Sequence, residues 1–313
     1  MGKYDNVDRE YFTDLERAAE LFSAGVYHWR LKMGGRDLQA IERTYPSLHS
    51  LSGTLERDAI FLCEKQRVKY GLEIETHADY AMPRRFLTYD ACEYEREAER
   101  MRSEHEQSGD LVTFDEIKSG MKQSDSYCPV INLLLYLGKG HFRGKDVLRD
   151  LFSIPQRVKP FVFEKIQNYS YALLEAEYVD PDEFHTDLKY FFRAMQCRND
   201  KKKLKGLLAQ EEYECLARAA QKAIAVHLNI KELAKKVVEE DEEMCKAYRD
   251  LIADERAEAK QEGILEGIQE GIQEGIQQMV TCLEKIKSGS SRQVLLAEGF
   301  DPRVVEQAWT LML

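Results

Sequence analysis

The sequence lacks any uncharged apolar run that approaches the roughly 18 residues of a membrane-spanning helix. Its best apolar run, residues 129–137 (PVINLLLYL), has the length of a strand. The first residues, MGKYDNVDREYF, lack the apolar segment of a signal peptide. The 7 cysteines are widely spaced and never form a CxxC pair, which argues against a disulfide framework or a zinc site. We therefore expect a cytoplasmic protein with reduced thiols and no membrane partner.

An excess of basic residues is also missing. The chain has 45 Lys and Arg against 56 Asp and Glu, which gives a net charge of −11. This charge argues against a non-specific binder of polyanions, although a local basic patch can still hold nucleic acid. Hydrophobic residues make up 43% of the 313 residues, enough for one main domain with an appendage.

Alternating strand and helix patterns fill the first 205 residues. The apolar periodicity predicts helices at residues 9–25, 79–106 and 181–205, and a polar loop with a short helix at 107–127. It predicts strands at residues 55–63, 67–76, 129–137 and 168–177, the first two close enough to form a hairpin. We expect an α/β domain at residues 1–205, with a mixed sheet flanked by helices.

The remaining residues have no strand signal and predict an all-helical C-terminal region. We divide it into a charged helical region at 206–256, a repeat helix at 257–280 and a helical cap at 281–313 that contains Trp309. The repeat, EGILEGIQEGIQEGIQQ, places a glycine and an isoleucine in every four residues. Each glycine costs about 1 kcal/mol relative to alanine in a helix. Two interpretations remain: a helix that joins copies of the chain into a homo-oligomer, or a semi-flexible spacer.

Two carboxylates share one face of the strand within KYGLEIETH, residues 69–77. Glu73 and Glu75 lie two residues apart, and Gly71 precedes them on the same face, where a backbone or a ligand can approach closely. A solvated strand face is one explanation. The alternative is a site for a divalent ion, since Asp58 lies in the preceding strand and three carboxylates offer the hard oxygen ligands that Mg²⁺ prefers.

The sequence around these residues resembles a known family. An acidic residue in one strand followed by an acidic Glu-x-(Lys or Gln) pair in the next is typical of the PD-(D/E)XK nuclease superfamily. Within it, GLEIETHADYAMPRRFLTYDACEY, FDEIKSGMKQSDSYCPVINLLLYLG and FHTDLKYFFRAMQCRNDKKKL are similar to stretches of the Rpn family of recombination-promoting nucleases, also called transposase-like or YhgA-like proteins. The resemblance covers roughly residues 10–280.

The resemblance implies a PD-(D/E)XK-like fold and a DNA endonuclease that uses Mg²⁺ or Mn²⁺. Asp58 and Glu73 match the metal-binding acids, and the backbone carbonyl of Ile74 matches a further ligand. Glu75 replaces the usual glutamine or lysine, so it cannot donate a hydrogen bond when ionised and would instead assist the attacking water or ligate metal. Glu20 corresponds either to the first-helix acid of the superfamily or to an ordinary exposed glutamate.

Basic residues near these acids are candidates for DNA contacts. Arg84 and Arg85 follow the acidic strand, and Lys139 and Arg143 lie in the Gly-rich loop GKGHFRGK, which also contains His141. His77 falls on the face of Glu75 and is a further candidate. Besides a nuclease, the sequence allows a DNA-binding or regulatory protein whose catalysis is impaired by Glu75, and an interaction scaffold built on the repeat helix.

Overall fold

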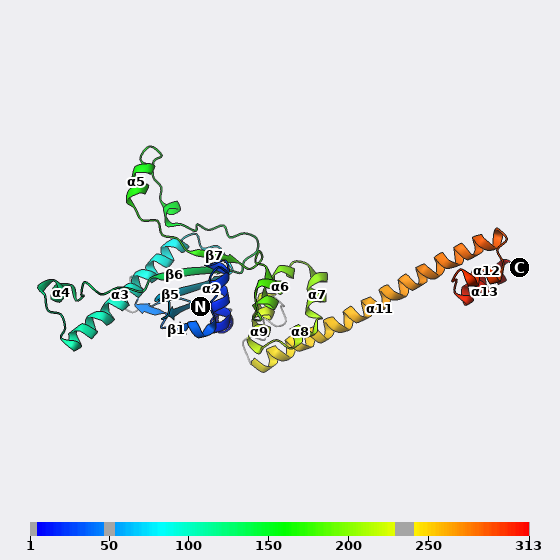
Figure 1. The fold of residues 1–313 in the computed structure, drawn as a ribbon, viewed down its shortest axis with the longest axis horizontal. Helices are drawn as coiled ribbons and strands as arrows, with labels where there is room; N and C mark the ends of the chain where they lie inside the picture. Colours follow the sequence, from blue (N-terminus) through cyan, green and yellow to red (C-terminus); the bar gives the residue numbers. More distant parts are fainter. Residues whose placement is uncertain (1–4, 47–53, 229–240, 313) are drawn as a thin grey trace. The chain divides into compact units, whose positions relative to one another are not determined.

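A computed structural model describes residues 5–46, 54–228 and 241–312 (Figure 1). The chain divides into two compact units. The first comprises Met1–Leu204 and Glu212–Tyr248, and the second comprises Lys205–Glu211 and Arg249–Leu313. Among the described helices, none combines the length and the apolar character needed to cross a membrane.

The first unit is built on a five-stranded mixed sheet with the strand order β1-β4-β5-β6-β7. Its strands are β1 (Gln39–Ala40), β4 (Ala59–Cys63), β5 (Val68–Glu75), β6 (Val130–Tyr136) and β7 (Ala172–Glu175). Strand β4 pairs with β1 and β5 in the antiparallel sense, whereas β5, β6 and β7 are parallel. A separate two-stranded sheet joins β2 (Thr44–Pro46) and β3 (Thr54–Glu56). The β4–β5 hairpin and the strands predicted at 67–76, 129–137 and 168–177 are confirmed, the last of them shortened to β7. The strand predicted at 55–63 is wrong as a single element, because the chain breaks at Arg57 and Asp58 into β3 and β4 of different sheets.

Helices cover both faces of this sheet. The side chains of β5 alternate between the two faces, so each face offers residues on which a helix can pack. Tyr70 packs against Phe22 of α2 (Leu15–Gly25), with ring centroids 5.0 Å apart. Lys69, on the opposite face, pairs with Glu93 and Glu97 of α3 (Met82–Ser108). Pro83 lies in the first turn of α3, where its missing N–H leaves no hydrogen bond unmade. The structure is therefore mixed α/β, as the sequence predicts.

The remaining helices of the chain differ from the prediction mainly at their ends. The helix predicted at 9–25 is interrupted at Thr13 and Asp14, because the side chain of Asp14 accepts from the Arg17 N–H and starts a new helix. The helix predicted at 181–205 begins only at Leu188 and is broken after Cys197. The other elements are α1 (Asp5–Phe12), α4 (Phe114–Ser119), α5 (Lys159–Lys165), α6 (Leu188–Cys197), α7 (Lys201–Leu208), α8 (Glu211–Glu214), α9 (Arg218–His227), α11 (Asp241–Lys287), α12 (Arg292–Ala297) and α13 (Pro302–Met312).

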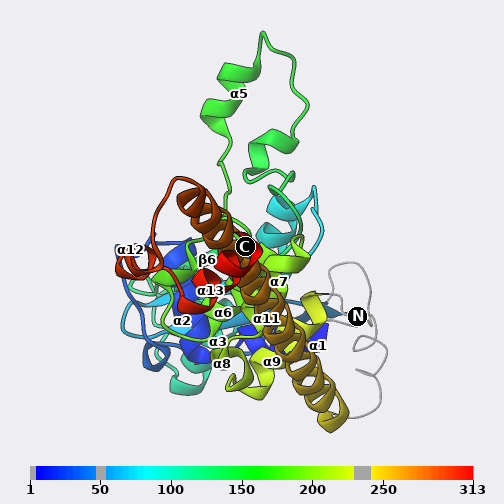
Figure 2. The ribbon, with the colours of Figure 1, turned by 90° about the vertical axis from the view of Figure 1, so that its right-hand side faces the viewer.

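Two features extend the first unit beyond its sheet. Helix α9 packs against α1 and α6, so chain beyond residue 205 contributes to this unit. Figures 1 and 2 both show α5 on a long excursion that leaves the sheet between β6 and β7.

The second unit has a small core of its own at the end of α11. Cys282, Leu295, Val305 and Ala308 are buried there, and Trp309 packs against them. The predicted helical cap at the end of the chain is formed by α12 and α13.

Candidate functional site

The acidic residues Asp58 and Glu73 meet where β4 begins and β5 approaches its end. The Asp58 carboxylate accepts a hydrogen bond from the Ile74 N–H at 2.8 Å. In return, the Glu73 carboxylate accepts from the Asp58 N–H at 3.3 Å. In a strand, the N–H and C=O of one residue point to the same edge, so the Ile74 carbonyl also points towards the side of Asp58. The structure thus brings together the three groups that the sequence predicts as metal ligands on these strands.

Arg85 of α3 bridges the two glutamates of β5. Its guanidinium donates to the Glu73 carboxylate and to the Glu75 carboxylate, at 2.5 Å in each case. It also donates to the Tyr89 hydroxyl at 3.2 Å. The side chain of Glu73 is fully buried, whereas that of Arg85 is 31% exposed. The sequence predicts Arg85 as a DNA contact; in the structure it lies inside the acidic cluster and neutralises part of its charge.

Burial perturbs the protonation of these carboxyl groups. Burial, followed by the charge of Asp58, raises the pKa of Glu73 to about 8, although Arg85 and Arg57 act in the opposite direction. Burial also raises the pKa of Glu75, against the lowering effect of Arg85. A buried carboxylate ionises readily only next to a cation. The end of β5 that carries Glu73 and Glu75, which we call its open end, therefore favours binding of positive charge.

Gly71 has a different role from the one the sequence suggests. A Cβ atom at this position would collide with the side chains of Arg57 and Asn132, so the space beside Gly71 is filled by protein and not by a ligand. Arg57 is fully buried there and pairs with Asp90, which in turn accepts from Asn132 and from the Tyr169 hydroxyl. This network ties β6 and the segments before β4 and β7 to α3, and it occupies the space beside Gly71 of β5.

Glu20 does not join the acidic cluster. Its carboxylate accepts from the His185 N–H at 2.7 Å and from the Thr186 hydroxyl at 2.6 Å. It therefore holds the loop before α6 to α2. The interpretation of Glu20 as a first-helix metal ligand has no support in this geometry, and neither does the alternative of an exposed glutamate, because the residue is 8% exposed.

The other predicted DNA contacts lie on the surface around this end of the sheet. Arg84 is exposed on α3, and Lys139 and Arg143 are exposed in the loop after β6. Glu177 and Glu175 accept from the Gly140 and Phe142 N–H groups and so fix the shape of that loop.

Sequence reasoning missed two groups at the acidic cluster. Arg9 of α1 lies 3.7 Å from the Asp58 carboxylate, which no local pattern predicts because 49 positions separate them in the chain. Tyr89 accepts from Arg85 and donates to the Glu56 carbonyl at 2.8 Å. The spacing of Arg85 and Tyr89, four residues apart on one helix, is a signal that could have found the second group.

The predicted metal ion can be compared with the donors at this site. Within the described residues, no group of three or more His, Cys, Asp and Glu side chains is arranged to hold a metal. Mg²⁺, however, is commonly bound by one or two carboxylates together with waters and substrate phosphate. Asp58, the buried Glu73 and the Ile74 carbonyl offer oxygen donors of this kind, provided that Arg85 releases Glu73.

No model of a known protein family, no curated protein and no solved structure matches the chain.

Proposed function

We propose that this protein is a DNA endonuclease that depends on Mg²⁺ or Mn²⁺. The observation that carries the proposal is the buried carboxylate of Glu73 beside Asp58, at an end of β5 where the neutralising arginine is partly exposed. A buried glutamate and a half-buried aspartate beside a partly exposed arginine have the chemistry of a site for a divalent ion and a phosphate. The resemblance to the Rpn family, based on the sequence, supports the same function.

Each residue of the cluster has a role in this proposal. Asp58 and Glu73 would hold the ion, with the Ile74 carbonyl as a further ligand. A bound ion would supply a Lewis acid for the phosphoryl group and would lower the pKa of a water molecule. Glu75, which is two residues beyond Glu73 on the same face, would assist in positioning the attacking water. Arg85 carries two parallel N–H donors, which match a phosphate as well as they match the two glutamates.

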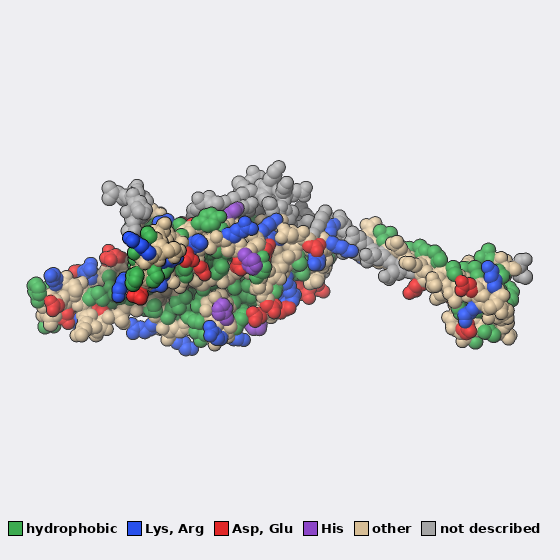
Figure 3. Space-filling model, turned by 90° about the horizontal axis from the view of Figure 1, so that it is seen from above, with side chains coloured by type: hydrophobic (Ala, Val, Ile, Leu, Met, Phe, Trp, Pro, Cys, Tyr) green, Lys and Arg blue, Asp and Glu red, His purple; other side chains and the backbone are tan. Residues whose placement is uncertain are grey.

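The surface charge is compatible with a local interaction with DNA. Figure 3 shows Lys, Arg, Asp and Glu side chains interspersed over the visible face of the first unit, without a large area of one sign. This face is therefore not uniformly acidic. A uniformly acidic surface would have favoured a scaffold without a role in nucleic-acid binding. Recognition would then depend on a few placed basic groups rather than on a broad positive field.

The direct test is cleavage of supercoiled plasmid by the purified full-length chain. We expect nicked and linear products with Mg²⁺ or Mn²⁺ and no products with EDTA. Cleavage that persists in EDTA, or its absence with every divalent ion tested, would overturn the proposed activity.

One observation favours a second candidate, a DNA-binding or regulatory protein without cleavage. Arg85 occupies two of the three carboxylates, and Glu75 supplies no donor for water or phosphate. If Arg85 stays in place when DNA binds, the site stays closed to metal. Binding of duplex DNA in a gel-shift assay without metal-dependent cleavage would support this candidate, and a lack of DNA binding would favour an interaction scaffold.

We further propose that α11 joins copies of the chain. Its four repeat isoleucines, Ile264, Ile268, Ile272 and Ile276, are 53–60% exposed. A Cβ atom added at any of the intervening glycines would meet nothing within 4 Å, so a second helix can approach them closely. A second copy of the same helix offers the matching pattern of isoleucine and glycine, and burying about four isoleucines would stabilise such a pair by several kcal/mol.

Truncation after Arg256 tests the role of α11. We expect a lower molecular mass by light scattering and a larger share of nicked over linear plasmid, because cutting both strands needs two sites near one duplex. An unchanged mass would reduce the repeat to a spacer. An unchanged ratio of nicked to linear product would show that the pairing of active sites does not depend on this helix.

A further inference from the structure

A cavity of about 590 Å³ lies beyond the ends of the parallel strands β5 and β6. It is lined by the segment after β5, the loop after β6, the residue that follows α6, and the end of α9. No Asp or Glu is among the described residues that line the cavity. Its four basic side chains come from separate segments and are His77, Lys139, Arg198 and His227. In a chain of net charge −11, such a lining is an exception.

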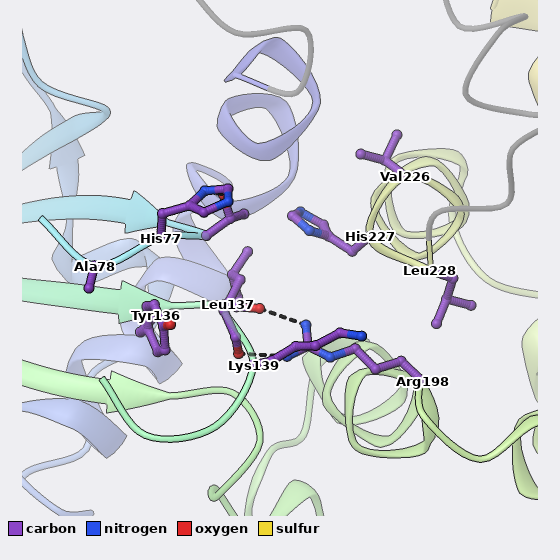
Figure 4. Close-up of a pocket in the computed structure, with 11 residues that line it drawn as sticks. His77, Ala78, Tyr136, Leu137, Lys139, Arg198, Val226, His227 and Leu228 are labelled. Atoms are coloured by element: carbon purple, nitrogen blue, oxygen red, sulfur yellow. Dashed lines mark hydrogen bonds between the residues drawn. The ribbon is translucent and has the colours of Figure 1, made fainter. Parts of the chain in front are cut away.

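Two of the four basic groups shape the cavity. Arg198 donates to the carbonyls of Leu137 and Gly138, at 2.7 and 2.6 Å, and pairs with Glu177 at 2.6 Å (Figure 4). Its side chain is only 8% exposed. The His227 ring is held by Asp8, with Nε2 and the carboxylate 2.5 Å apart. These contacts fix the loop after β6 and the end of α9, so the cavity wall is formed before any ligand binds.

The other two basic groups are available to a ligand. His77 and Lys139 are exposed, and neither has a carboxylate within ion-pair distance among the residues that the structure describes. The Nδ1 atom of His77 lies 2.9 Å from the Thr76 hydroxyl, which leaves its Nε2 atom for another partner. Figure 4 shows His77 and His227 on opposite sides of the cavity, with Lys139 and Arg198 along its lower side.

The remaining wall suits a group larger than a simple anion. Val226 and Leu228 of the α9 end contribute an apolar side, and Ala78 lies opposite, after β5 (Figure 4). A cavity of this size accommodates a ligand of several hundred daltons. A lining that combines several basic groups with aliphatic side chains matches a phosphate attached to a less polar ring.

We propose that this cavity binds a phosphoryl group carried by a nucleotide, with Lys139 and His77 as its direct contacts. The nucleotide is either a free mononucleotide or the phosphorylated end of a DNA strand. His77 lies two residues after Glu75, so a strand end bound here lies beside the acidic cluster. The DNA form of this inference rests on the proposed endonuclease function, whereas binding of a free mononucleotide does not.

The test measures binding by the full chain in EDTA, where no metal-dependent cleavage can contribute. Isothermal titration calorimetry compares deoxyadenosine 5′-monophosphate with deoxyadenosine, and a short single-stranded oligonucleotide with and without a 5′-phosphate. We expect the phosphorylated compounds to bind and the others to bind at least about tenfold more weakly, since one charge-assisted contact accounts for a difference of that size. Preference for the oligonucleotide over the mononucleotide identifies a DNA end as the ligand, and the reverse identifies a free nucleotide.

Matched variants place the binding in this cavity. Lys139→Gln and His77→Gln should each weaken binding of the phosphorylated ligand about tenfold. Lys145→Gln, at an exposed lysine of the same loop outside the cavity, should leave it unchanged. Equal binding of deoxyadenosine and its monophosphate, or equal effects of Lys139→Gln and Lys145→Gln, would overturn the inference. Either result leaves the metal-dependent cleavage test unaffected, so the two proposals fail separately.

Discussion

The two ends of the α3-facing side of β5 are built from the same kinds of residue but differ in exposure. At one end, Lys69 pairs with Glu93 and Glu97 at 2.8 and 2.7 Å, and all three side chains are at most 8% exposed. At the other end, Glu73 and Glu75 pair with Arg85, which is 31% exposed. At the first end the cation that the two glutamates share is buried, although the partly exposed Arg96 and the exposed Arg100 also reach Glu93 and Glu97, at 3.2 and 3.9 Å. At the second end the shared cation, Arg85, is itself partly exposed.

This difference separates a structural ion pair from a candidate site. Breaking a buried ion pair leaves an uncompensated charge inside the protein and is strongly unfavourable. A partly exposed arginine can exchange one partner for another with less cost, because water replaces the lost hydrogen bonds. The candidate site therefore differs from the structural ion pair in one respect, namely that the cation shared by its two glutamates is partly exposed.

The largest expected effect separates the two ends by activity. Glu73→Gln and Asp58→Asn should each reduce the initial rate of plasmid nicking by more than about 100-fold, because each would remove a charged ligand of the proposed ion. Glu97→Gln is the matched control, since it neutralises a buried glutamate of the other end. Nicking at the wild-type rate by Asp58→Asn would show that the site assignment is wrong.

The second comparison concerns stability. Lys69→Met should lower the free energy of unfolding by about 3 kcal/mol, because two buried glutamates lose their shared buried cation and keep only the more exposed Arg96 and Arg100. Arg85→Met should cost only about 1 kcal/mol, since the arginine is partly exposed and Glu73 can take up a proton at neutral pH. Urea unfolding followed by Trp29 fluorescence, in a Trp309→Phe background, reports on the first unit. Equal losses in the two variants would remove the distinction between the ends.

Arg85 should compete with metal for Glu73. Arg85→Met is expected to raise the affinity for Mn²⁺ by at least about tenfold, because a positive charge leaves the immediate surroundings of the ion. The affinity of Lys69→Met for Mn²⁺, measured at a temperature at which this variant remains folded, should equal that of the wild type. A weaker affinity in Arg85→Met would mean that Arg85 orders the carboxylates for metal rather than blocking them.

The pH dependence of stability provides a smaller effect. The pKa of Glu73 is raised from 4.5 to about 8 in the folded protein, so the folded state binds this proton more tightly than the unfolded state does. The contribution of Glu73 to stability is therefore complete below pH 4.5 and is lost as the pH rises through about 8. Glu73→Gln should flatten this part of the stability profile of the metal-free protein, measured by urea unfolding. If Glu73→Gln keeps the wild-type dependence of the unfolding free energy on pH, the effect belongs to another group.

The smallest expected change is at Glu75. Glu75→Gln and Glu75→Lys should retain or raise cleavage, because either restores a hydrogen-bond donor at this position. Plasmid nicking rates and Mn²⁺ titrations of the two variants check this. Loss of both activity and metal affinity would show instead that Glu75 is a required ligand or base.

The sequence predicts the sheet and the carboxylates well because both depend on local pattern. The alternation in KYGLEIETH gives β5 and the common face of Glu73 and Glu75, and the short distance to residues 55–63 gives the hairpin that brings Asp58 alongside. The long apolar run at residues 129–137 gives a buried strand, which pairs in parallel with β5.

What the sequence could not give depends on contacts between distant residues. Glu20 looks like any amphipathic-helix glutamate until the loop at His185 and Thr186 reaches it. The space beside Gly71 is taken by Arg57, whose burial depends on Asp90 and Asn132 from two other elements. The basic cavity likewise joins His77 to His227, which are 150 positions apart and meet only because α9 packs on α1 and α6.

The most direct test of the central claim is the binding of Mn²⁺ to the purified chain in the absence of DNA, followed by electron paramagnetic resonance of the free ion. The account predicts that the wild type and Glu97→Gln bind Mn²⁺ with similar affinity, and that Glu73→Gln does not bind it over the same concentration range. Equal binding by Glu73→Gln, or no binding by the wild type and by Arg85→Met alike, would contradict the claim that the open end of β5 is a metal site.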